Sequence, residues 1–324
     1  MQNKPKVVQI THNLGIGGVE TYIESIIDYS CESDQFVIAT DSGGIIADKM
    51  KAQIGRKIFI GDGTEEKLLC ILKEIQPEIA HIHYGGNKES WIIDVVARCG
   101  IKIIAHRHSV CEWNNKVNKW LSITNEQGCE TISPFPNIKK LRLMDINDCL
   151  LPIGSGRKNI GMIARKEKTG SNNRLYELAH LCPEYNFYFV GVEENKNISS
   201  NCFEIKKTYY NGSVYKQLDG FLYNYDGESD GFPVVLLEAL AMGKIVFVDS
   251  GIGFISGILR DSINCIKIDC NNIPSQKNVI NNIFSQDDFI RDIIQNGYSL
   301  IDSYFNPEAI VSKIEDIYME ILNG

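Results

Sequence analysis

The sequence predicts an α/β protein of two domains, each a parallel β-sheet with helices on both faces. Short apolar runs alternate with amphipathic runs along the whole chain, and 324 residues exceed what one hydrophobic core usually holds. Strands buried on both faces are mostly apolar and β-branched, as the runs at 6–10 and 36–40 are. This alternation is typical of Rossmann-like domains.

The same alternation places the individual elements. In the first half, strands are expected at 6–10, 36–40, 57–60, 79–83 and 102–105, and helices at 19–29, 65–75 and 89–99. In the second half, strands are expected at 159–163, 187–190, 220–223 and 245–249, and helices at 173–181 and 233–242. We expect an N-terminal domain over 1–155 and a C-terminal domain over 156–306. A final helix within 307–324, which follows a break at 304–306, is expected to cross back to the N-terminal domain.

Composition narrows the classes of function. A net charge of −8 argues against a nucleic-acid partner. No run of 18 consecutive apolar residues occurs, so we expect no transmembrane helix. We also expect no signal peptide, because the N-terminus runs straight into a predicted strand. Ten cysteines without a CxxC pair favour a reducing compartment, so we expect a cytoplasmic protein with mostly buried free thiols. Basic-aromatic stretches at 113–120 and 138–143 allow peripheral contact with the inner membrane face, although such stretches are more often solvated helix faces.

The segment 230–241, DGFPVVLLEALA, is the most informative part of the chain. It places Asp230 and Glu238 eight positions apart around an apolar run, with Pro233 expected in the first turn of a helix and Glu238 about two turns in. A ligand at the helix N-terminus would meet free N–H groups and both carboxylates, which suits the diphosphate and hydroxyls of a nucleotide sugar. The alternative is that Asp230 only caps the helix and Glu238 is solvated.

Two other loops follow predicted strands. Gly17 and Gly18 precede a helix, so their backbone can approach ligand oxygens closely. Their spacing does not match the dinucleotide fingerprint GxGxxG. After the strand at 159–163, Arg165 and Lys168 can neutralise a diphosphate and stabilise it as a leaving group, the alternative being a solvated turn.

Four of the six histidines form two His-x-His pairs, His81 with His83 and His106 with His108, each at the end of a predicted strand. Alternate residues of a strand point to the same side, so a metal site is one interpretation of either pair. No acidic residue accompanies them at ligand spacing. We expect His81 to pack beneath an interdomain cleft and His108 to face substrate.

Together these motifs resemble those of the retaining glycosyltransferases of family 4, which have the GT-B fold of two facing Rossmann-like domains. The family's E-x7-E signature is similar to residues 230–239. Further similarities are Gly17-Gly18-Val19-Glu20, Ala164-Arg165 with Lys168, His81-Ile82-His83, and Ala105-His106-Arg107-His108-Ser109.

The resemblance implies a retaining, metal-independent transfer of a sugar from a nucleoside-diphosphate sugar, with UDP favoured and no cofactor. The acceptor would be a glycan, a lipid-linked sugar or a small molecule, bound on the side of the N-terminal domain. The implied catalytic residues are Arg165 and Lys168 at the diphosphate, Asp230 at the donor sugar and His108 at the transferred sugar. The implied donor-binding residues are Glu238, at the ribose hydroxyls, with Gly17, Gly18, Gly231, Phe232 and Pro233. His83, His106 and Arg107 would lie on the acceptor side.

The chain departs from the family pattern in two places. Asp230 replaces the usual Glu, and no acid follows Gly251 in the loop after the strand at 245–249. These departures leave open a non-catalytic GT-B relative that binds a partner. A separate alternative is another GT-B enzyme, a nucleotide-sugar 2-epimerase.

Overall fold

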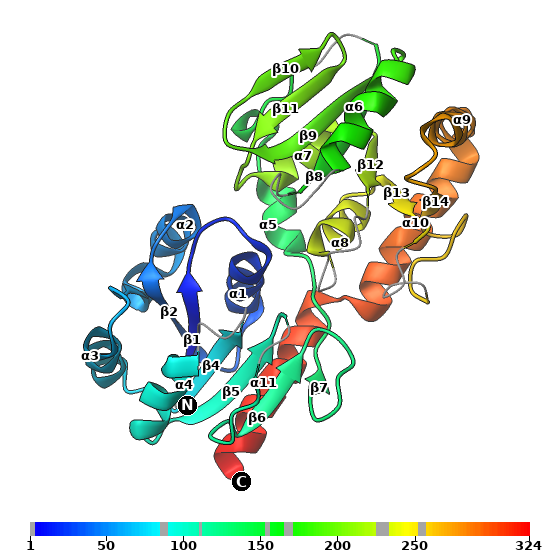
Figure 1. Ribbon diagram of the computed structural model, residues 1–324. Coiled ribbons are helices and arrows are strands. Elements are labelled where there is room, and N and C mark those ends of the chain that lie inside the picture. The colour runs from blue at the N-terminus through cyan, green and yellow to red at the C-terminus, as the bar shows by residue number, and fades with distance from the viewer. Residues whose placement is uncertain are drawn as a thin grey trace. The chain divides into compact units, whose positions relative to one another are not determined.

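A computed structural model describes residues 4–84, 90–109, 112–152, 156–164, 171–224, 233–251 and 257–324. The chain forms two compact units (Figure 1). Unit 1 comprises Met1–Asn137 and Asn306–Gly324, and unit 2 comprises Ile138–Phe305. The last helix therefore groups with unit 1. Residues 138–152, which from the sequence are expected in the N-terminal domain, group with unit 2 because the helix that begins at Ile138 packs on helices of that unit.

Unit 1 contains a seven-stranded parallel sheet with strand order β3-β2-β1-β4-β5-β6-β7. Its strands are β1 (Lys6–Asn13), β2 (Asp34–Ser42), β3 (Ile58–Ile60), β4 (Ile79–Tyr84), β5 (Lys102–Arg107), β6 (Lys119–Ser122) and β7 (Glu130–Thr131). Its helices are α1 (Gly18–Tyr29), α2 (Ile45–Ile54), α3 (Glu65–Ile75), α4 (Ser90–Arg98) and α11 (Pro307–Asn323), with a 3-10 turn at Gly55–Lys57.

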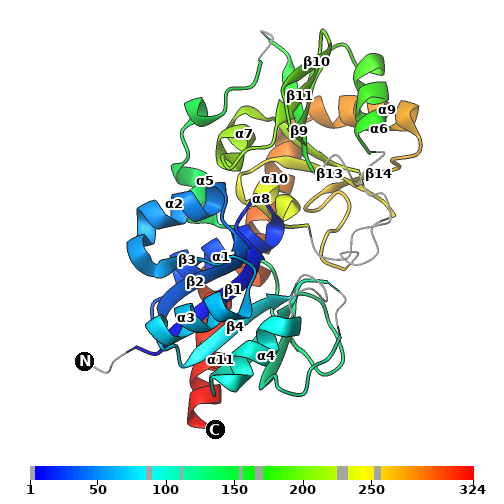
Figure 2. The same cartoon turned by 60° about the vertical axis from the view of Figure 1, so that its left-hand side comes forward.

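The two faces of the unit 1 sheet are covered by different helices (Figures 1 and 2). Successive strand residues point to opposite faces, so Val8 and Ala80 pack under α3 and α4, whereas Val7 and Ile79 pack under α1 and α11. On the second face the apolar residues give way, toward the carboxyl ends of the strands, to the buried polar residues Gln9, His81, His83 and His106. A buried polar layer therefore lies near the edge of the sheet where α/β proteins bind ligands.

Unit 2 also contains a seven-stranded sheet, with order β10-β11-β9-β8-β12-β13-β14, parallel except for β10. Its strands are β8 (Lys158–Ile163), β9 (Tyr185–Val192), β10 (Lys196–Ser199), β11 (Cys202–Lys206), β12 (Gly220–Tyr223), β13 (Ile245–Asp249) and β14 (Ile266–Ile268). Its helices are α5 (Ile138–Leu143), α6 (Ser171–Leu181), α7 (Asn211–Gln217), α8 (Val234–Ala241), α9 (Ile273–Phe284) and α10 (Asp287–Tyr304), with a 3-10 turn at Ile146–Asp148.

The core of unit 2 is divided by its sheet. Helices α7, α8 and part of α10 pack on one face, and α6 and α9 pack on the other. The ends of β8 and β9 approach each other closely beside Gly191, whose φ is +145°. A Cβ atom there would lie 1.8 Å from the carbonyl oxygen of Ala164, so only glycine fits.

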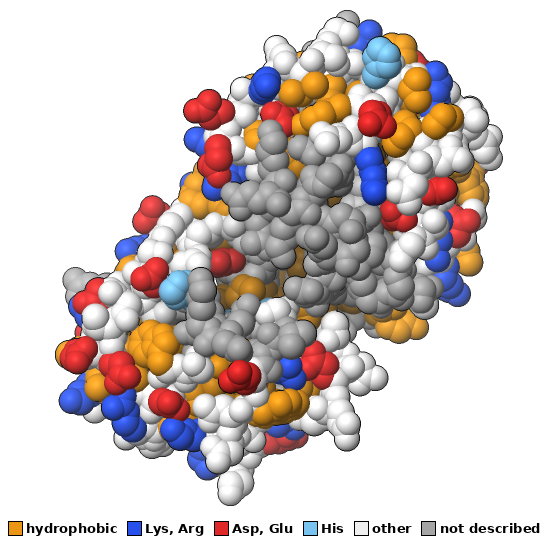
Figure 3. Space-filling model, viewed as in Figure 1, with side chains coloured by type: hydrophobic (Ala, Val, Ile, Leu, Met, Phe, Trp, Pro, Cys, Tyr) orange, Lys and Arg blue, Asp and Glu red, His pale blue; other side chains and the backbone are white. Residues whose placement is uncertain are grey.

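Two expectations from the sequence are wrong. Residues 113–120 are not a helix face, because a loop leads there into β6. The thiols are not mostly buried: of the nine described cysteines, four are buried, namely Cys182, Cys202, Cys265 and Cys270. In the part of the chain that the structure describes, none of the helices has both the length and the apolar character needed to cross a bilayer. Acidic and basic side chains are intermixed on the described part of the face in Figure 3.

Candidate functional site

In unit 2, the chain order of the sheet reverses between β8 and β12, and ligands of open α/β sheets bind beyond the carboxyl ends of strands at such a point. The segments 165–170 and 225–232 follow these two strands. Five predicted site residues fall in these segments and lie outside the described residues: Arg165, Lys168, Asp230, Gly231 and Phe232. The described part of the site is therefore the helix that follows, α8.

Helix α8 begins at Val234, with Pro233 as its N-cap rather than in its first turn. Glu238 is the fifth residue of α8 and lies about one turn, not two, from the helix start. Its side chain is only 4% exposed, so the alternative of a solvated helix residue is wrong. A buried carboxylate one turn from a helix N-terminus needs partners, since burial of an unpaired charge is costly.

Two residues of α7 supply those partners. Oε2 of Glu238 accepts hydrogen bonds from Nδ2 of Asn211, at 3.3 Å, and from the hydroxyl of Tyr215, at 3.1 Å. Asn211 and Tyr215 are four residues apart and so share one face of the helix. The Tyr215 oxygen also lies 3.0 Å from the carbonyl of Val235. Among the described residues, Oε1 of Glu238 has no partner, so it can accept from a ligand.

Helix α7 reaches this position because of Gly212. A Cβ atom at Gly212 would lie 2.2 Å from the carbonyl oxygen of Leu141, so glycine lets α7 pack directly on α5. Sequence reasoning missed Asn211 and Tyr215, and their four-residue spacing on a short helix was the available signal.

The electrostatics of Glu238 reflect its burial. Burial raises the pKa of the Glu238 carboxyl above its ordinary value, while the Tyr215 hydrogen bond, the positive charge of Lys140 on α5 and the Asn211 amide oppose the rise. Burial also raises the pKa of Tyr215 well above its ordinary value, with Glu238 adding to the effect. Tyr215 is therefore a neutral hydrogen-bond donor at physiological pH.

In unit 1, the glycine-rich loop leads directly into α1, whose N-cap is Gly17. A Cβ atom at Gly17 would lie 2.3 Å from Oε2 of Glu20, whereas one at Gly18 would meet nothing within 4 Å. The carboxylate of Glu20 thus lies beside the amide end of α1, where negative charge is favoured. An anionic ligand at Gly17 would have to displace that side chain, while Gly18 is open.

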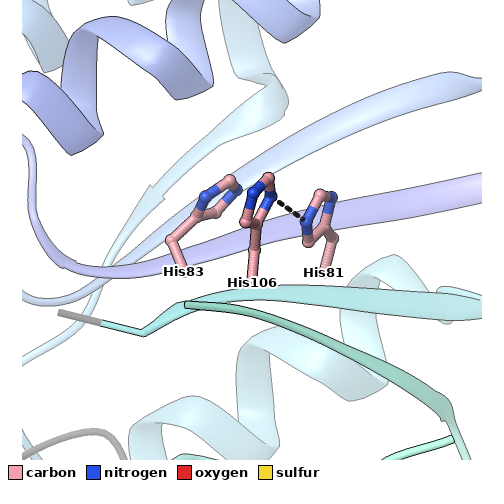
Figure 4. A group of neighbouring side chains, drawn as sticks. All are labelled: His81, His83 and His106. Carbon is pink, nitrogen blue, oxygen red and sulfur yellow. Dashed lines mark hydrogen bonds between the residues drawn. The ribbon is translucent and has the colours of Figure 1, made fainter. Parts of the chain in front are cut away.

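The two His-x-His pairs are adjacent, because β4 and β5 are neighbouring parallel strands with His83 opposite His106. His81, His83 and His106 are buried and lie side by side (Figure 4), with ligand nitrogens within 4.8 Å of one another, close enough to be considered for a metal ion. Hydrogen bonds occupy both ring nitrogens of His81 and of His83, and Nδ1 of His106. In this trio only Nε2 of His106 lacks a partner, so a metal would have to replace these bonds.

Burial keeps these rings neutral. It lowers the pKa of His81 and of His108 to about 3, and it lowers the pKa of His83 and of His106 well below the ordinary value. Neighbouring histidines lower the pKa further in each ring except that of His108. His108 is the most accessible of the four, since its side chain is only partly buried at the end of β5.

Arg107 points to the opposite face from its histidine neighbours, as strand alternation requires. Its guanidinium is 2.6 Å from Oε2 of Glu126 and stacks 5.0 Å from the ring of Trp113. Both contacts hold Arg107 in place within unit 1.

Comparison with known proteins gives one family and a fold. The family model described as Glycosyl transferases group 1 matches residues 153–300. No curated protein matches the chain. A glycosyltransferase from Rickettsia africae is 16% identical, with 99% of each chain covered and a TM-score of 0.76. Anabaena Alr3699/HepE in complex with UDP and glucose is 12% identical, with 98% of this chain and 100% of that chain covered and a TM-score of 0.77.

A third similar structure is the pneumococcal O-GlcNAc transferase GtfA in complex with UDP and GlcNAc. It is 11% identical, with 99% of this chain and 100% of that chain covered and a TM-score of 0.65. At these identities the likeness establishes the fold. The predicted fold class, two parallel-sheet α/β domains of the GT-B type with helices on both sheet faces, is confirmed.

Proposed function

Through residues 153–300 the chain belongs to the glycosyl transferases group 1 family and is a glycosyltransferase, and we propose that it is a retaining, metal-independent one that uses a UDP-sugar. Anabaena HepE is in complex with UDP and glucose, and pneumococcal GtfA with UDP and GlcNAc. These two complexes favour UDP as the nucleotide of the donor and a hexose as the transferred group.

The observation that carries the proposal is the environment of Glu238. Oε2 is held by Asn211 and Tyr215, so the carboxylate has a defined orientation, and Oε1 is left to accept from a ligand. The two neighbouring hydroxyls of a ribose are hydrogen-bond donors that suit such an acceptor. A hydrogen bond to a charged group contributes about 1.5–3 kcal/mol, which corresponds to roughly 10- to 150-fold in affinity.

The remaining roles follow the family pattern. Arg165, Lys168 and the amide end of α8 would stabilise the negative charge that develops on the diphosphate. Asp230 would bind the donor sugar, and His108 the transferred sugar. The bond from C1 of the sugar to the diphosphate breaks, with its electron pair going to the phosphate oxygen. The acceptor oxygen bonds to C1 on the same face, and its proton passes to the departing phosphate.

The first experiment measures binding of UDP-, GDP-, ADP- and dTDP-sugars to the full chain by thermal shift and calorimetry, with and without EDTA. We expect UDP-sugars to bind selectively and EDTA to have no effect. Glu238→Gln should weaken UDP binding about tenfold or more. Glu204→Gln is the matched control, because Glu204 is equally buried in unit 2, on β11, and also accepts from a tyrosine, Tyr176. It should bind UDP as the wild type does.

The products then decide between the activities. Incubation of the bound sugar nucleotide with a panel of acceptors should yield a glycoside that keeps the anomeric configuration of the donor. An epimerised sugar nucleotide formed without acceptor would identify a 2-epimerase instead. Failure of every nucleotide to bind, or equal binding by the Glu238→Gln variant and the wild type, would refute the proposed site.

A further inference from the structure

A continuous chain of hydrogen bonds crosses the buried polar layer of unit 1, and we call it the buried relay. It consists of Glu315 on α11, Ser33 just before β2, Gln35 on β2, Gln9 on β1, His83 on β4 and His108 after β5. All but His108 are at most 8% exposed. The strands β2, β1, β4 and β5 are consecutive in the sheet, so the relay runs across it from an α11 carboxylate to a partly exposed imidazole.

The carboxylate sets the direction of the first link. Glu315 accepts from the backbone N–H groups of Cys31, Glu32 and Ser33, at 3.2, 2.9 and 3.0 Å, and from the Ser33 hydroxyl at 2.6 Å. Because a carboxylate with these partners only accepts, the single hydroxyl proton of Ser33 points to it. Oγ of Ser33 must then act as an acceptor toward Gln35, 2.7 Å away.

The side-chain amides of Gln35 and Gln9 continue the chain with donor and acceptor in the same order. Gln35 uses its Nε2 toward Ser33, so its Oε1 faces Gln9 and accepts from Nε2 of Gln9 at 2.8 Å. Oε1 of Gln9 then faces Nε2 of His83 at 2.7 Å. Each amide has one orientation that agrees with the link before it, so His83 must carry its proton on Nε2.

The last link reaches His108. Nδ1 of His83 lies 3.0 Å from Nε2 of His108 and, being unprotonated, accepts from it. Burial lowers the pKa of both rings, to about 3 for His108, so each carries one proton. His108 therefore holds its proton on Nε2. Its Nδ1 is an unprotonated acceptor with no partner among the described residues.

A second chain of hydrogen bonds branches from Gln9 toward His106, and its donors and acceptors agree with the same orientation of the Gln9 amide. The second N–H of Gln9 donates to the hydroxyl oxygen of Tyr318 at 3.0 Å, which leaves the Tyr318 proton for Nδ1 of His81 at 2.8 Å. Nε2 of His81 then donates to Nδ1 of His106 at 3.3 Å. This assigns the His106 proton to Nε2, the one nitrogen of that ring without a partner.

We propose that Glu315, Ser33, Gln35 and Gln9 are positioning residues that hold His108 in the Nε2–H tautomer, so that its Nδ1 accepts a hydrogen bond from a sugar hydroxyl. The hydroxyl as the ligand group rests on the proposed function, whereas the tautomer does not. An acceptor at this position selects for ligand groups that donate, and it disfavours a carboxylate or carbonyl oxygen there because that oxygen would face a lone pair.

The tautomer can be measured on the full chain without ligand. Long-range 15N–1H correlation spectra of the protein labelled at histidine distinguish a protonated ring nitrogen from an unprotonated one. In the wild type we expect His108 to show protonated Nε2 and unprotonated Nδ1, as a single form. Protonated Nδ1, or a mixture of tautomers, in the wild type would overturn the proposal whatever the variants show.

Two substitutions interrupt the relay. Ser33→Ala removes the link to the carboxylate, and Gln9→Met removes the acceptor of His83. In both, His108 should become a mixture of tautomers. Ser25→Ala is the matched control, because Ser25 is a buried serine of α1 that donates to the carbonyl of Thr21 at 2.7 Å, outside the relay. It should keep the single form. An unchanged tautomer in Ser33→Ala overturns the positioning role, and that milder variant decides alone if Gln9→Met does not fold.

Kinetics extend the test to the ligand. With the UDP-sugar identified by the binding panel, Gln9→Met should lower kcat about tenfold while the Kd for UDP changes less than about twofold, because a misplaced donor at His108 affects the sugar and not the nucleotide. Equal losses in kcat and in UDP affinity would indicate general disruption and contradict the role. Absence of sugar transfer by the wild type would count against the proposed function alone, since the spectra need no substrate.

Discussion

Acidification should destabilise unit 1 through its buried histidines, and His81 allows the size of the effect to be worked out. Its ring is fully buried, with a pKa lowered from 6.5 to about 3. Between these two values the unfolded chain binds a proton that the folded chain does not. The contribution of His81 to stability is therefore complete above pH 6.5 and is lost progressively as the pH falls toward 3.

Each pH unit in this window is worth about 1.4 kcal/mol per site. At pH 5, His81 alone should lower the free energy of unfolding by about 2 kcal/mol relative to pH 8. Burial lowers the pKa of His83, His106 and His108 as well, so their contributions have the same sign. A domain with a typical stability of about 5–15 kcal/mol should lose a large part of it.

Tryptophan fluorescence measures this in the intact protein, because Trp91, Trp113 and Trp120 all belong to unit 1. Urea unfolding of the wild type and of His81→Asn is followed at pH 8 and pH 5. The difference in the free energy of unfolding between the two proteins at pH 8 gives the pH-independent effect of the substitution. This difference is subtracted from the one found at pH 5. From pH 8 to pH 5 the wild type should lose about 2 kcal/mol more than the variant. If both lose the same amount, His81 takes up its proton in the folded state and the assignment of a neutral layer is refuted.

Two further substitutions test unit 2. Tyr215→Phe should cost about 1 kcal/mol of stability and weaken UDP binding several-fold, because it removes a hydrogen bond to Glu238. Its control is Tyr188→Phe, which removes another buried hydroxyl of unit 2. This control should cost similar stability and leave UDP binding unchanged. Gly191→Ala should lower stability by about 3 kcal/mol, seen as a fall in Tm, because a backbone carbonyl occupies the place of its Cβ. The control is Gly257→Ala, where a Cβ meets nothing within 4 Å, and equal Tm values for these two variants would contradict the packing argument.

Much of the fold could be predicted from the sequence, because strand and helix periodicity is a local property of the chain. Apolar β-branched runs predicted β4 and β8 to within one residue of their observed bounds, whereas β1 continues to Asn13, beyond the predicted end at residue 10. Short strands such as β6, next to the edge strand β7, and the edge strand β10 were missed or misread, since their pairing depends on the sheet beside them and not on their own pattern.

Some features of the candidate site could likewise be predicted from the sequence, and others could not. The spacing of residues predicted that Glu238 stands in a helix that follows a strand and a loop, and that each His-x-His pair ends a strand, because helix and strand periodicity is a local property. That these two strands are neighbours was learned from the sheet. The burial of Glu238 against Tyr215 of α7, and the hydrogen bond from Gln9 to Tyr318, 309 residues away, exist only in the folded protein. Such partners come together through the packing of helices on the sheet. A hydrogen-bond direction or a lowered pKa exists only where burial has replaced water by those partners.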